Sequence, residues 1–172
     1  MSFPASTNVD TIVKHLKFYQ AKGDFIVVFS TYQSIDVVSK AQAKLLHETD
    51  GKFGKFDYIV CDEAHRTTGA KSKNKSESHF TKIHDNDFIH GAKRLYMTAT
   101  PRYYKDSVKK NAEEKDFILW SMDDESIYGK EFYRIGFGKA VSLGLLTDYK
   151  VLVLTVSEDE LSDELKAGIK KD

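Results

Sequence analysis

The chain has 172 residues, and its 26 lysine and arginine residues balance 26 aspartate and glutamate residues, so the formal net charge is zero. The length fits one domain with a tail, and a hydrophobic share of 41% supplies a core, which excludes wholesale disorder. The charge balance excludes a generally basic nucleic-acid coat, and no apolar run approaches the roughly 20 residues of a membrane helix. With the single cysteine Cys61 and no secretory signal, we expect a cytoplasmic protein without a membrane partner.

The first predicted elements are a helix and a strand. Apolar residues recur at three- and four-residue spacing over residues 9–19, which predicts a helix that Thr7 caps and Gly23 ends. Residues 25–30 are apolar at successive positions and rich in β-branched and aromatic types. This pattern predicts a strand that is covered on both faces.

The middle of the chain continues the alternation. Ser34 is expected to cap a second helix over residues 35–47, and a second strand follows at residues 58–61. The stretch 67–78 is polar and of low complexity, which predicts a surface loop. A third strand is predicted at residues 94–97.

The last third repeats the pattern with shorter elements. We predict a helix over residues 103–114, a strand over 117–121, a helix over 131–142 and a strand over 150–156, followed by a charged tail. Strands that alternate with helices favour a three-layer α/β sandwich. In it, helices cover both faces of a mainly parallel sheet.

The strongest chemical signal is the tetrapeptide Asp62-Glu63-Ala64-His65, which ends the apolar strand at residues 58–61. By average composition, this tetrapeptide arises by chance in a chain of this length on the order of once in a thousand. Ligands bind at the carboxyl ends of strands in an open parallel sheet. Two carboxylates there suit Mg²⁺ with a nucleotide, because one holds the ion and the next orients or deprotonates water. The alternative is a solvated turn that caps a helix.

Two further strand ends carry small hydroxyl side chains. Thr98 and Thr100 follow the strand at residues 94–97, and they would lie at the same sheet edge as the acids if the two strands are neighbours. Ser30 and Thr31 open the second helix, where hydroxyls and backbone N–H groups suit phosphate contact. Alone, each is also explained as an ordinary turn or cap.

Taken together, these elements resemble the first motor domain of a superfamily 2 helicase or translocase. Asp62-Glu63-Ala64-His65 matches the Walker B element in its Asp-Glu-Ala-His form, Thr98-Ala99-Thr100 matches motif III, and residues 30–33 are similar to motif Ib. The residues that flank these motifs and the stretch 136–149 resemble the helicase parts of restriction-modification enzymes and of related bacterial or phage helicases. The resemblance implies a RecA-like fold that acts on DNA rather than RNA.

The resemblance also assigns roles. Asp62 would coordinate Mg²⁺ with ATP, and Glu63 would activate the attacking water. Ser30 and Thr31 would contact the phosphates of the nucleic acid. Four residues would couple the nucleotide state to domain movement: His65, Thr98, Ala99 and Thr100.

The departures from the family pattern matter as much as the match. The sequence contains no Gly-x-x-x-x-Gly-Lys-Ser/Thr phosphate loop. We therefore expect residues 1–144 to be the second half of a first motor domain, and residues 145–172 to lead toward a second motor domain. The missing partners would be the Walker A half and that second domain. An uncovered sheet edge predicts self-association, and the lack of the phosphate cradle predicts an inactive isolated chain.

The sequence also allows two other functions. The chain could be a non-enzymatic remnant that binds nucleic acid or protein, or a metal-dependent nuclease that uses Asp62 and Glu63. A metal site among the histidines and aspartates of residues 79–90 has no compact zinc spacing. A basic cluster at Arg66 and nearby lysines is more often a solvated face than a nucleic-acid site. Cys61 is expected to be a buried small hydrophobe.

Overall fold

The computed structural model describes residues 4–72 and 78–150, and two compact units share the chain. The first unit extends over Met1–Lys130 and the second over Glu131–Asp172. Each is described by itself below, and the boundary predicted after residue 144 stays a prediction.

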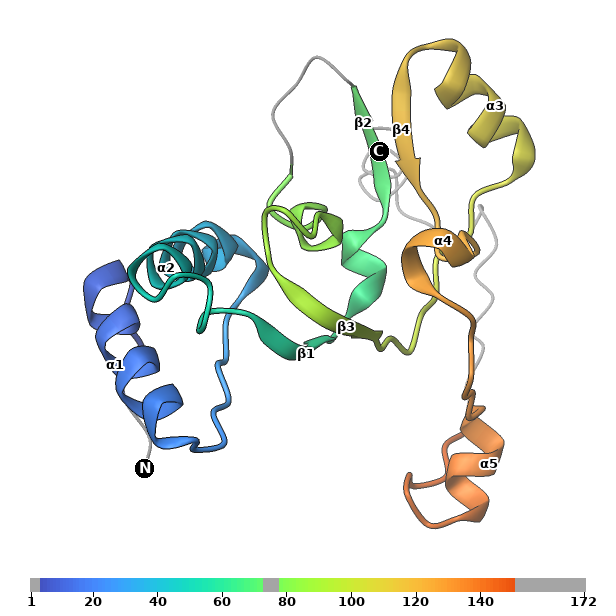
Figure 1. Cartoon of the computed structure of the whole chain (residues 1–172). Helices are drawn as coiled ribbons and strands as arrows, with labels where there is room; N and C mark the ends of the chain where they lie inside the picture. The colour runs from blue at the N-terminus through green and yellow to red at the C-terminus, as the bar shows by residue number, and fades with distance from the viewer. Residues whose placement is uncertain (1–3, 73–77, 151–172) are drawn as a thin grey trace, which may run out of the picture. The chain divides into compact units, whose positions relative to one another are not determined.

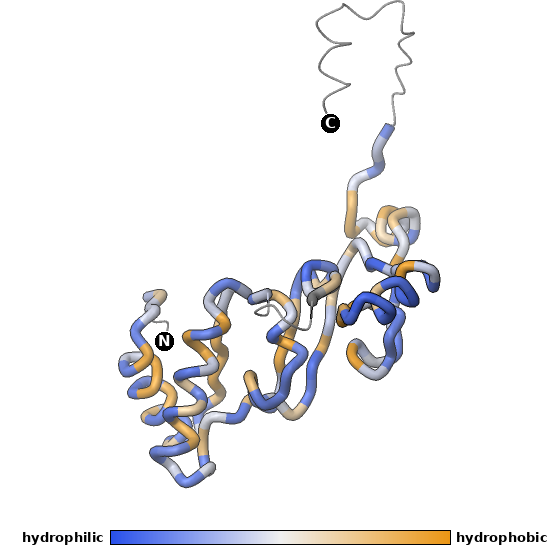
Figure 2. The backbone as a smooth tube through the Cα atoms, turned by 90° about the horizontal axis from the view of Figure 1, so that it is seen from above, coloured by the Kyte–Doolittle hydropathy of each residue, from blue (hydrophilic) through white to orange (hydrophobic). Residues whose placement is uncertain are grey.

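Two helices pack side by side in the first unit (Figures 1 and 2). Helix α1 extends over Val9–Lys22 and begins at Asn8, whose side chain accepts a hydrogen bond of 2.9 Å from the N–H of Thr11. The predicted cap, Thr7, is therefore wrong by one residue. Gly23 ends the helix as predicted, because it adopts a φ of 74° that a residue without a Cβ reaches at little cost.

Helix α2 extends over Ile35–Glu48, close to its predicted range. Ser34 lies at its start, but its side chain makes no capping hydrogen bond there. The apolar stripes of the two helices meet in a shared core, which explains why the periodicity predicted both helices. That core consists of Val13, Leu16, Ala41 and Leu45.

The parallel sheet consists of two strands in the described residues (Figure 1). Strand β1 extends over Phe56–Cys61 and β3 over Gly91–Tyr96, in a register that pairs the last residue of each, Cys61 and Tyr96. One face packs on a buried cluster, whereas Tyr58 and Val60 on the other face are exposed. The prediction of helices on both faces is therefore not met by the described residues.

The predicted strand at residues 25–30 is wrong as a hydrogen-bonded element. Side chains still alternate as in an extended chain, because Ile26 packs against the helical core while Phe25 and Phe29 are 94% and 93% exposed. A strand needs a neighbour for its backbone groups, and within the described residues none pairs with this segment.

A second, antiparallel sheet pairs β2, Gly69–Ser72, with β4, Phe117–Trp120. Helix α3, Asp106–Glu114, contacts β4, and both elements lie within their predicted ranges. The loop predicted over residues 67–78 is wrong at β2. Its polar sequence gives no strand signal, and the pairing with a strand about fifty positions away supplies the hydrogen bonds.

The predicted helix over residues 131–142 is wrong in its first half. Helix α5, in the second unit, extends only over Phe137–Ser142 and begins at Gly136. A short helix that the periodicity missed, α4, extends over Glu125–Tyr128 and is capped by Asp124. The strand predicted at 150–156 and the charged tail lie outside the described residues, apart from residue 150. No described helix is long and apolar enough to cross a membrane.

Candidate functional site

The carboxyl ends of β1 and β3 meet at one edge of the parallel sheet. The pairing continues past the strands, since the N–H of Met97 donates to the carbonyl of Cys61 at 2.9 Å and the N–H of Ala64 donates to the carbonyl of Met97 at 2.9 Å. The acids after β1 and the threonines after β3 are therefore brought together, as their strand-end positions predicted.

The two acids form a tight turn. The Oδ1 atom of Asp62 accepts a hydrogen bond of 2.9 Å from the N–H of Glu63, which adopts a left-handed conformation with φ of 49°. This conformation is uncommon for a residue with a side chain and is found at functional sites. A short 3-10 helix, η2, Ala64–Thr67, follows the turn. The turn leaves both acids exposed at the sheet edge.

His65 lies at the centre of the predicted coupling residues. Its Nδ1 atom is 3.0 Å from Oγ1 of Thr98, 3.2 Å from Oγ1 of Thr100 and 3.2 Å from Oε2 of Glu63. A protonated Nδ1 donates to the carboxylate, whereas an unprotonated Nδ1 accepts from the threonine hydroxyls. One ring nitrogen thus connects the acidic turn with the segment after β3.

The two threonines are also held to each other. The N–H of Thr100 donates to Oγ1 of Thr98 at 3.1 Å, with Ala99 between them. This local bond orients both hydroxyls toward the same imidazole nitrogen. The side chains of Glu63, Thr98 and Thr100 thus all lie within 3.2 Å of one atom, Nδ1 of His65.

Ser30 and Thr31 lie apart from the imidazole cluster. Both are exposed, at the start of a short 3-10 helix, η1, Tyr32–Ser34. Their hydroxyls make local bonds, Ser30 to the carbonyl of Thr31 at 3.0 Å and Thr31 to Oγ of Ser34 at 3.2 Å. They are accessible to a ligand, and among the described residues no hydrogen bond joins their side chains to the acids.

Tyr32 joins these two regions, and sequence reasoning missed it. Its hydroxyl donates to the carbonyl oxygen of Asp62 at 2.8 Å. Burial raises the pKa of Tyr32 well above its usual range, so the hydroxyl stays a donor at any physiological pH. The available signal was its place directly after Ser30 and Thr31, but only the fold reveals the partner.

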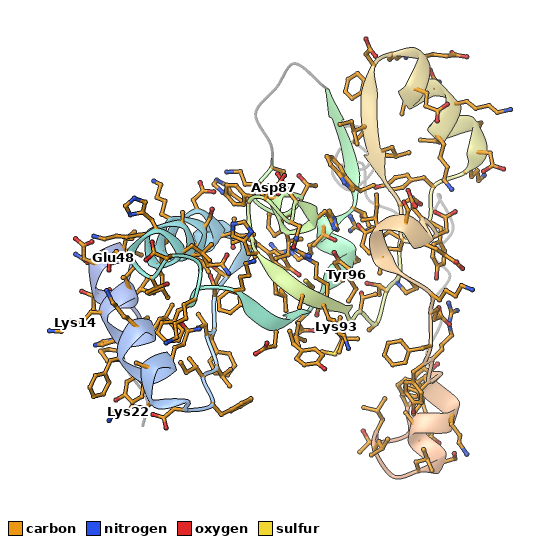
Figure 3. The ribbon with its side chains drawn as sticks, viewed as in Figure 1. Lys14, Lys22, Glu48, Asp87, Lys93 and Tyr96 are labelled. Atoms are coloured by element: carbon orange, nitrogen blue, oxygen red, sulfur yellow. The ribbon has the colours of Figure 1, made fainter. Side chains whose placement is uncertain are left out.

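The side chain of Arg94, in β3, holds the segment that precedes this strand. Arg94 donates to the carbonyls of Ile83 at 2.9 Å and Ile89 at 2.6 Å. Lys93 and Tyr96, labelled in Figure 3, lie on opposite faces of β3: Lys93 approaches the exposed ring of Tyr58, while the Tyr96 hydroxyl is 3.0 Å from Nδ1 of His84.

His84 and Cys61, two further residues that the sequence singled out, lie outside this cluster. The Nε2 atom of His84 lies 3.1 Å from the carbonyl oxygen of Thr67, in addition to the contact of its Nδ1 atom with Tyr96. The described residues contain no group of three or more histidine, cysteine or acidic side chains that could hold a metal. Cys61 is buried, and burial raises the pKa of its thiol to about 11, which makes it a poor nucleophile.

The donor set at the acidic turn still fits Mg²⁺ bound together with a nucleotide. Mg²⁺ prefers oxygen ligands and takes only one or two from carboxylates when phosphates and water complete its shell. The exposed carboxylate of Asp62 meets this need, which leaves the carboxylate of Glu63 free to act on water. A dedicated cage of protein ligands is not required.

The family comparison matches residues 2–103 to the family described as type III restriction enzyme, res subunit. These residues include β1, β3 and every predicted site residue. A search of curated proteins gives no match.

Two solved structures are similar to the chain. One is a nuclease-deletion mutant of the Type ISP restriction-modification enzyme LlaGI in complex with a DNA substrate mimic; its identity is 42% and its TM-score 0.60. The other is the ATP-dependent Type ISP restriction-modification enzyme LlaBIII bound to DNA, with 44% identity and a TM-score of 0.60. The matches cover 87% and 86% of this chain but only 11% and 10% of those enzymes.

Proposed function

Since the chain belongs to the family of type III restriction enzyme res subunits and is related to the superfamily 2 helicase region of Type ISP enzymes, we propose that it is the motif II and motif III half of an ATP-dependent DNA helicase or translocase. The observation that carries the proposal is the convergence of Glu63, Thr98 and Thr100 on Nδ1 of His65. Such a contact suits a motor, because it joins a catalytic acid to a neighbouring strand.

In this proposal, the acidic turn serves hydrolysis. Asp62 provides an oxygen ligand for a divalent cation, and Glu63 accepts a proton from the attacking water. Mg²⁺ and ATP, when bound to the complete motor, supply the cation and the phosphoryl group. Because the chain lacks a phosphate loop and its lysine, we expect the isolated 172 residues to be inactive.

In this proposal, His65 couples the state of the nucleotide to the segment that follows β3. When Glu63 carries its negative charge, a protonated Nδ1 of His65 donates to it; when that carboxyl is engaged elsewhere, the nitrogen turns to Thr98 and Thr100. The exchange of partners passes the state of the acid to the segment after β3. Ala99, between the two threonines, belongs to the same unit.

The nucleic-acid side of the proposal rests on Ser30 and Thr31. Their exposed hydroxyls suit contact with backbone phosphate, which positions a strand without reading its sequence. Tyr32 links them to the carbonyl of Asp62. DNA is the proposed substrate because both similar structures contain DNA or its mimic.

A chimera tests the function. We would replace the matching region of LlaGI with these residues and measure ATP turnover with and without DNA. We expect DNA-stimulated turnover that Glu63→Gln lowers by about 10²–10⁴-fold, the usual contribution of a general base. Glu113→Gln, an exposed change in α3, is the matched control and should leave turnover intact.

Three outcomes of these measurements would contradict different parts of the proposal. Equal turnover with Glu63→Gln and with the control would refute the role of the acid. A folded chimera that binds DNA equally well with and without nucleotide, and never turns ATP over, would favour a non-enzymatic binding remnant. Turnover by the isolated chain would refute its expected inactivity.

A further inference from the structure

A second histidine, His84, lies between the end of β3 and the segment that follows the acidic turn. It ends a short 3-10 helix, η3, Lys82–His84. Its Nδ1 atom is 3.0 Å from the hydroxyl of Tyr96, the last residue of β3. Its Nε2 atom is 3.1 Å from the carbonyl oxygen of Thr67, the last residue of η2, and 3.3 Å from the hydroxyl of Tyr128 in α4. One imidazole thus bridges β3, η2 and α4.

Three aromatic rings hold the plane of this imidazole. The ring of Trp120, in β4, is stacked on it, with centroids 6.2 Å apart and an interplanar angle of 19°. The rings of Tyr96 and Tyr128 lie at centroid distances of 5.5 Å and 5.0 Å. Packing of this kind restricts the rotamer of a side chain, so both ring nitrogens are kept facing their hydrogen-bond partners.

The chemistry of the partners determines the direction of each hydrogen bond. A carbonyl only accepts, so the neutral imidazole carries its hydrogen on Nε2 and donates it to Thr67. The unprotonated Nδ1 atom therefore accepts from the hydroxyl of Tyr96. Burial raises the pKa of Tyr96 above its usual range and raises that of Tyr128 to about 12, so both hydroxyls remain donors.

Thr67 connects this histidine with the acidic turn. It is 0% exposed, and its hydroxyl donates to the carbonyl of Ala64 at 2.8 Å. Since the single hydrogen of the Thr67 hydroxyl is given to Ala64, the hydroxyl of Tyr128, at 3.1 Å, donates to Thr67. Ala64 follows Glu63 directly, and its N–H donates to the carbonyl of Met97 at 2.9 Å. Both backbone polar groups of Ala64 are therefore held in place.

The backbone of Glu63 depends on this support. Its φ of 49° lies in the left-handed region, which a residue with a side chain keeps only where its surroundings hold it there. The pairing of β1 with β3 holds the chain before the turn, and the bonds of Thr67 and His84 hold the chain after it. A general base must lie within hydrogen-bond distance of the proton that it accepts, so the position of Glu63 decides its use in hydrolysis.

We propose that His84 is a positioning residue for the hydrolytic step, and that it holds Glu63 where this acid accepts a proton from the attacking water. It acts through Thr67 and the carbonyl of Ala64, and it needs no contact with the nucleotide. The inference rests on the proposed function, because it requires Glu63 to be the general base. His65 contacts the side chain of the acid, whereas His84 acts on the backbone beside it.

ATP turnover of the LlaGI chimera with two substitutions of His84 tests this role. His84→Leu removes both hydrogen bonds, whereas the amide nitrogen of His84→Gln still reaches the carbonyl of Thr67. A misplacement of about 1 Å from a change outside the reacting groups can cost about 10²-fold in rate. We therefore expect His84→Leu to lower kcat by about 10–100-fold with an unchanged KM for ATP, and His84→Gln to stay within about threefold of the unsubstituted chimera.

A double substitution separates positioning from a loss of folded enzyme. If His84 acts through Glu63, His84→Leu should leave the residual turnover of Glu63→Gln unchanged, because the acid that it positions is already absent. A loss of folded enzyme would instead lower turnover by the same factor with and without Glu63→Gln. His47→Leu is the matched control, because His47 is exposed in the last turn of α2, and it should leave turnover intact.

Two results would overturn the inference while the proposed function stands. One is turnover of His84→Leu equal to that of His47→Leu, and the other is an equal fall with and without Glu63→Gln. Turnover that Glu63→Gln does not lower would refute the proposed function, and the inference with it.

The hydrogen-bond directions are tested without turnover, on the 172-residue chain. Long-range proton–nitrogen NMR correlation at about pH 8, where an unperturbed histidine is neutral, should place the hydrogen of His84 on Nε2. A hydrogen on Nδ1 instead would remove the donation to Thr67 and overturn the inference.

Discussion

Replacing Gln42 by leucine should destabilise the first unit strongly. Gln42 is 1% exposed in α2, and its Nε2 atom donates to the carbonyls of Gly54 at 2.8 Å and His90 at 2.9 Å. Its Oε1 atom accepts from the N–H of His90 at 3.1 Å. One side chain thus holds the chain just before β1 and just before β3. Leucine has a similar volume but leaves all three backbone groups without this partner.

The expected loss follows from two of those groups, the carbonyl of Gly54 and the N–H of His90, because the carbonyl of His90 keeps a second donor, the N–H of Phe56, at 3.1 Å. Each buried group that loses its hydrogen bond costs about 1–3 kcal/mol. A buried leucine offsets about 1.5–3 kcal/mol of this by its apolar surface. Two such groups cost about 4 kcal/mol at midrange, and an offset of about 2 kcal/mol leaves a fall of about 2 kcal/mol in the free energy of unfolding, a sizeable part of the roughly 5–15 kcal/mol of a typical domain.

Urea unfolding followed by circular dichroism measures this loss at a fixed protein concentration. Gln33→Leu is the matched control, because the same substitution at an exposed position of η1 should change the stability by less than about 0.5 kcal/mol. If Gln42→Leu were as stable as this control, the three hydrogen bonds would not hold the strand starts together.

Three further predictions concern the candidate site. Tyr32→Phe removes only the hydroxyl that donates to the carbonyl of Asp62, so urea unfolding should show a loss of about 1 kcal/mol, and an unchanged midpoint would contradict the bond. Burial raises the pKa of Tyr32 and raises that of Tyr128 to about 12, so the free energy of unfolding should have its full value below about pH 10, the pKa of tyrosine in the unfolded chain, and should decline above it. Alkaline melts in which the stability of Tyr32→Phe declines as steeply as that of the wild type would refute this. Glu63→Gly should stabilise the fold by up to about 1 kcal/mol, because glycine adopts the left-handed φ of 49° without strain, and it should abolish ATP turnover in the LlaGI chimera. A less stable variant would show that the contact of the Glu63 side chain with His65 outweighs the backbone strain.

Local patterns in the sequence predicted the parts of the molecule that depend on local interactions. The apolar stripes of α1 and α2 reflect a period of 3.6 residues, which any helix with one buried face must show. The apolar runs before Asp62 and Thr98 end where the chain meets solvent, so they located the acids and the hydroxyls at strand ends. The convergence on His65 followed once the two strands proved to be neighbours.

Contacts between distant residues needed the tertiary structure. Strand β2 was hidden in a polar stretch, because its hydrogen bonds come from β4 rather than from its own side chains. The donation from Tyr32 to Asp62 joins residues thirty positions apart and leaves no periodic trace in the sequence.

The segment of residues 25–29 shows the division most clearly. Its composition determined that it suits a strand, since β-branched and aromatic side chains fit a pleated surface. Whether it becomes a strand depends on a neighbour for its backbone, and in the described residues it has none. The side chains of a segment are given by its own sequence, whereas the pairing of its backbone N–H and C=O groups depends on which other segment the fold brings beside it.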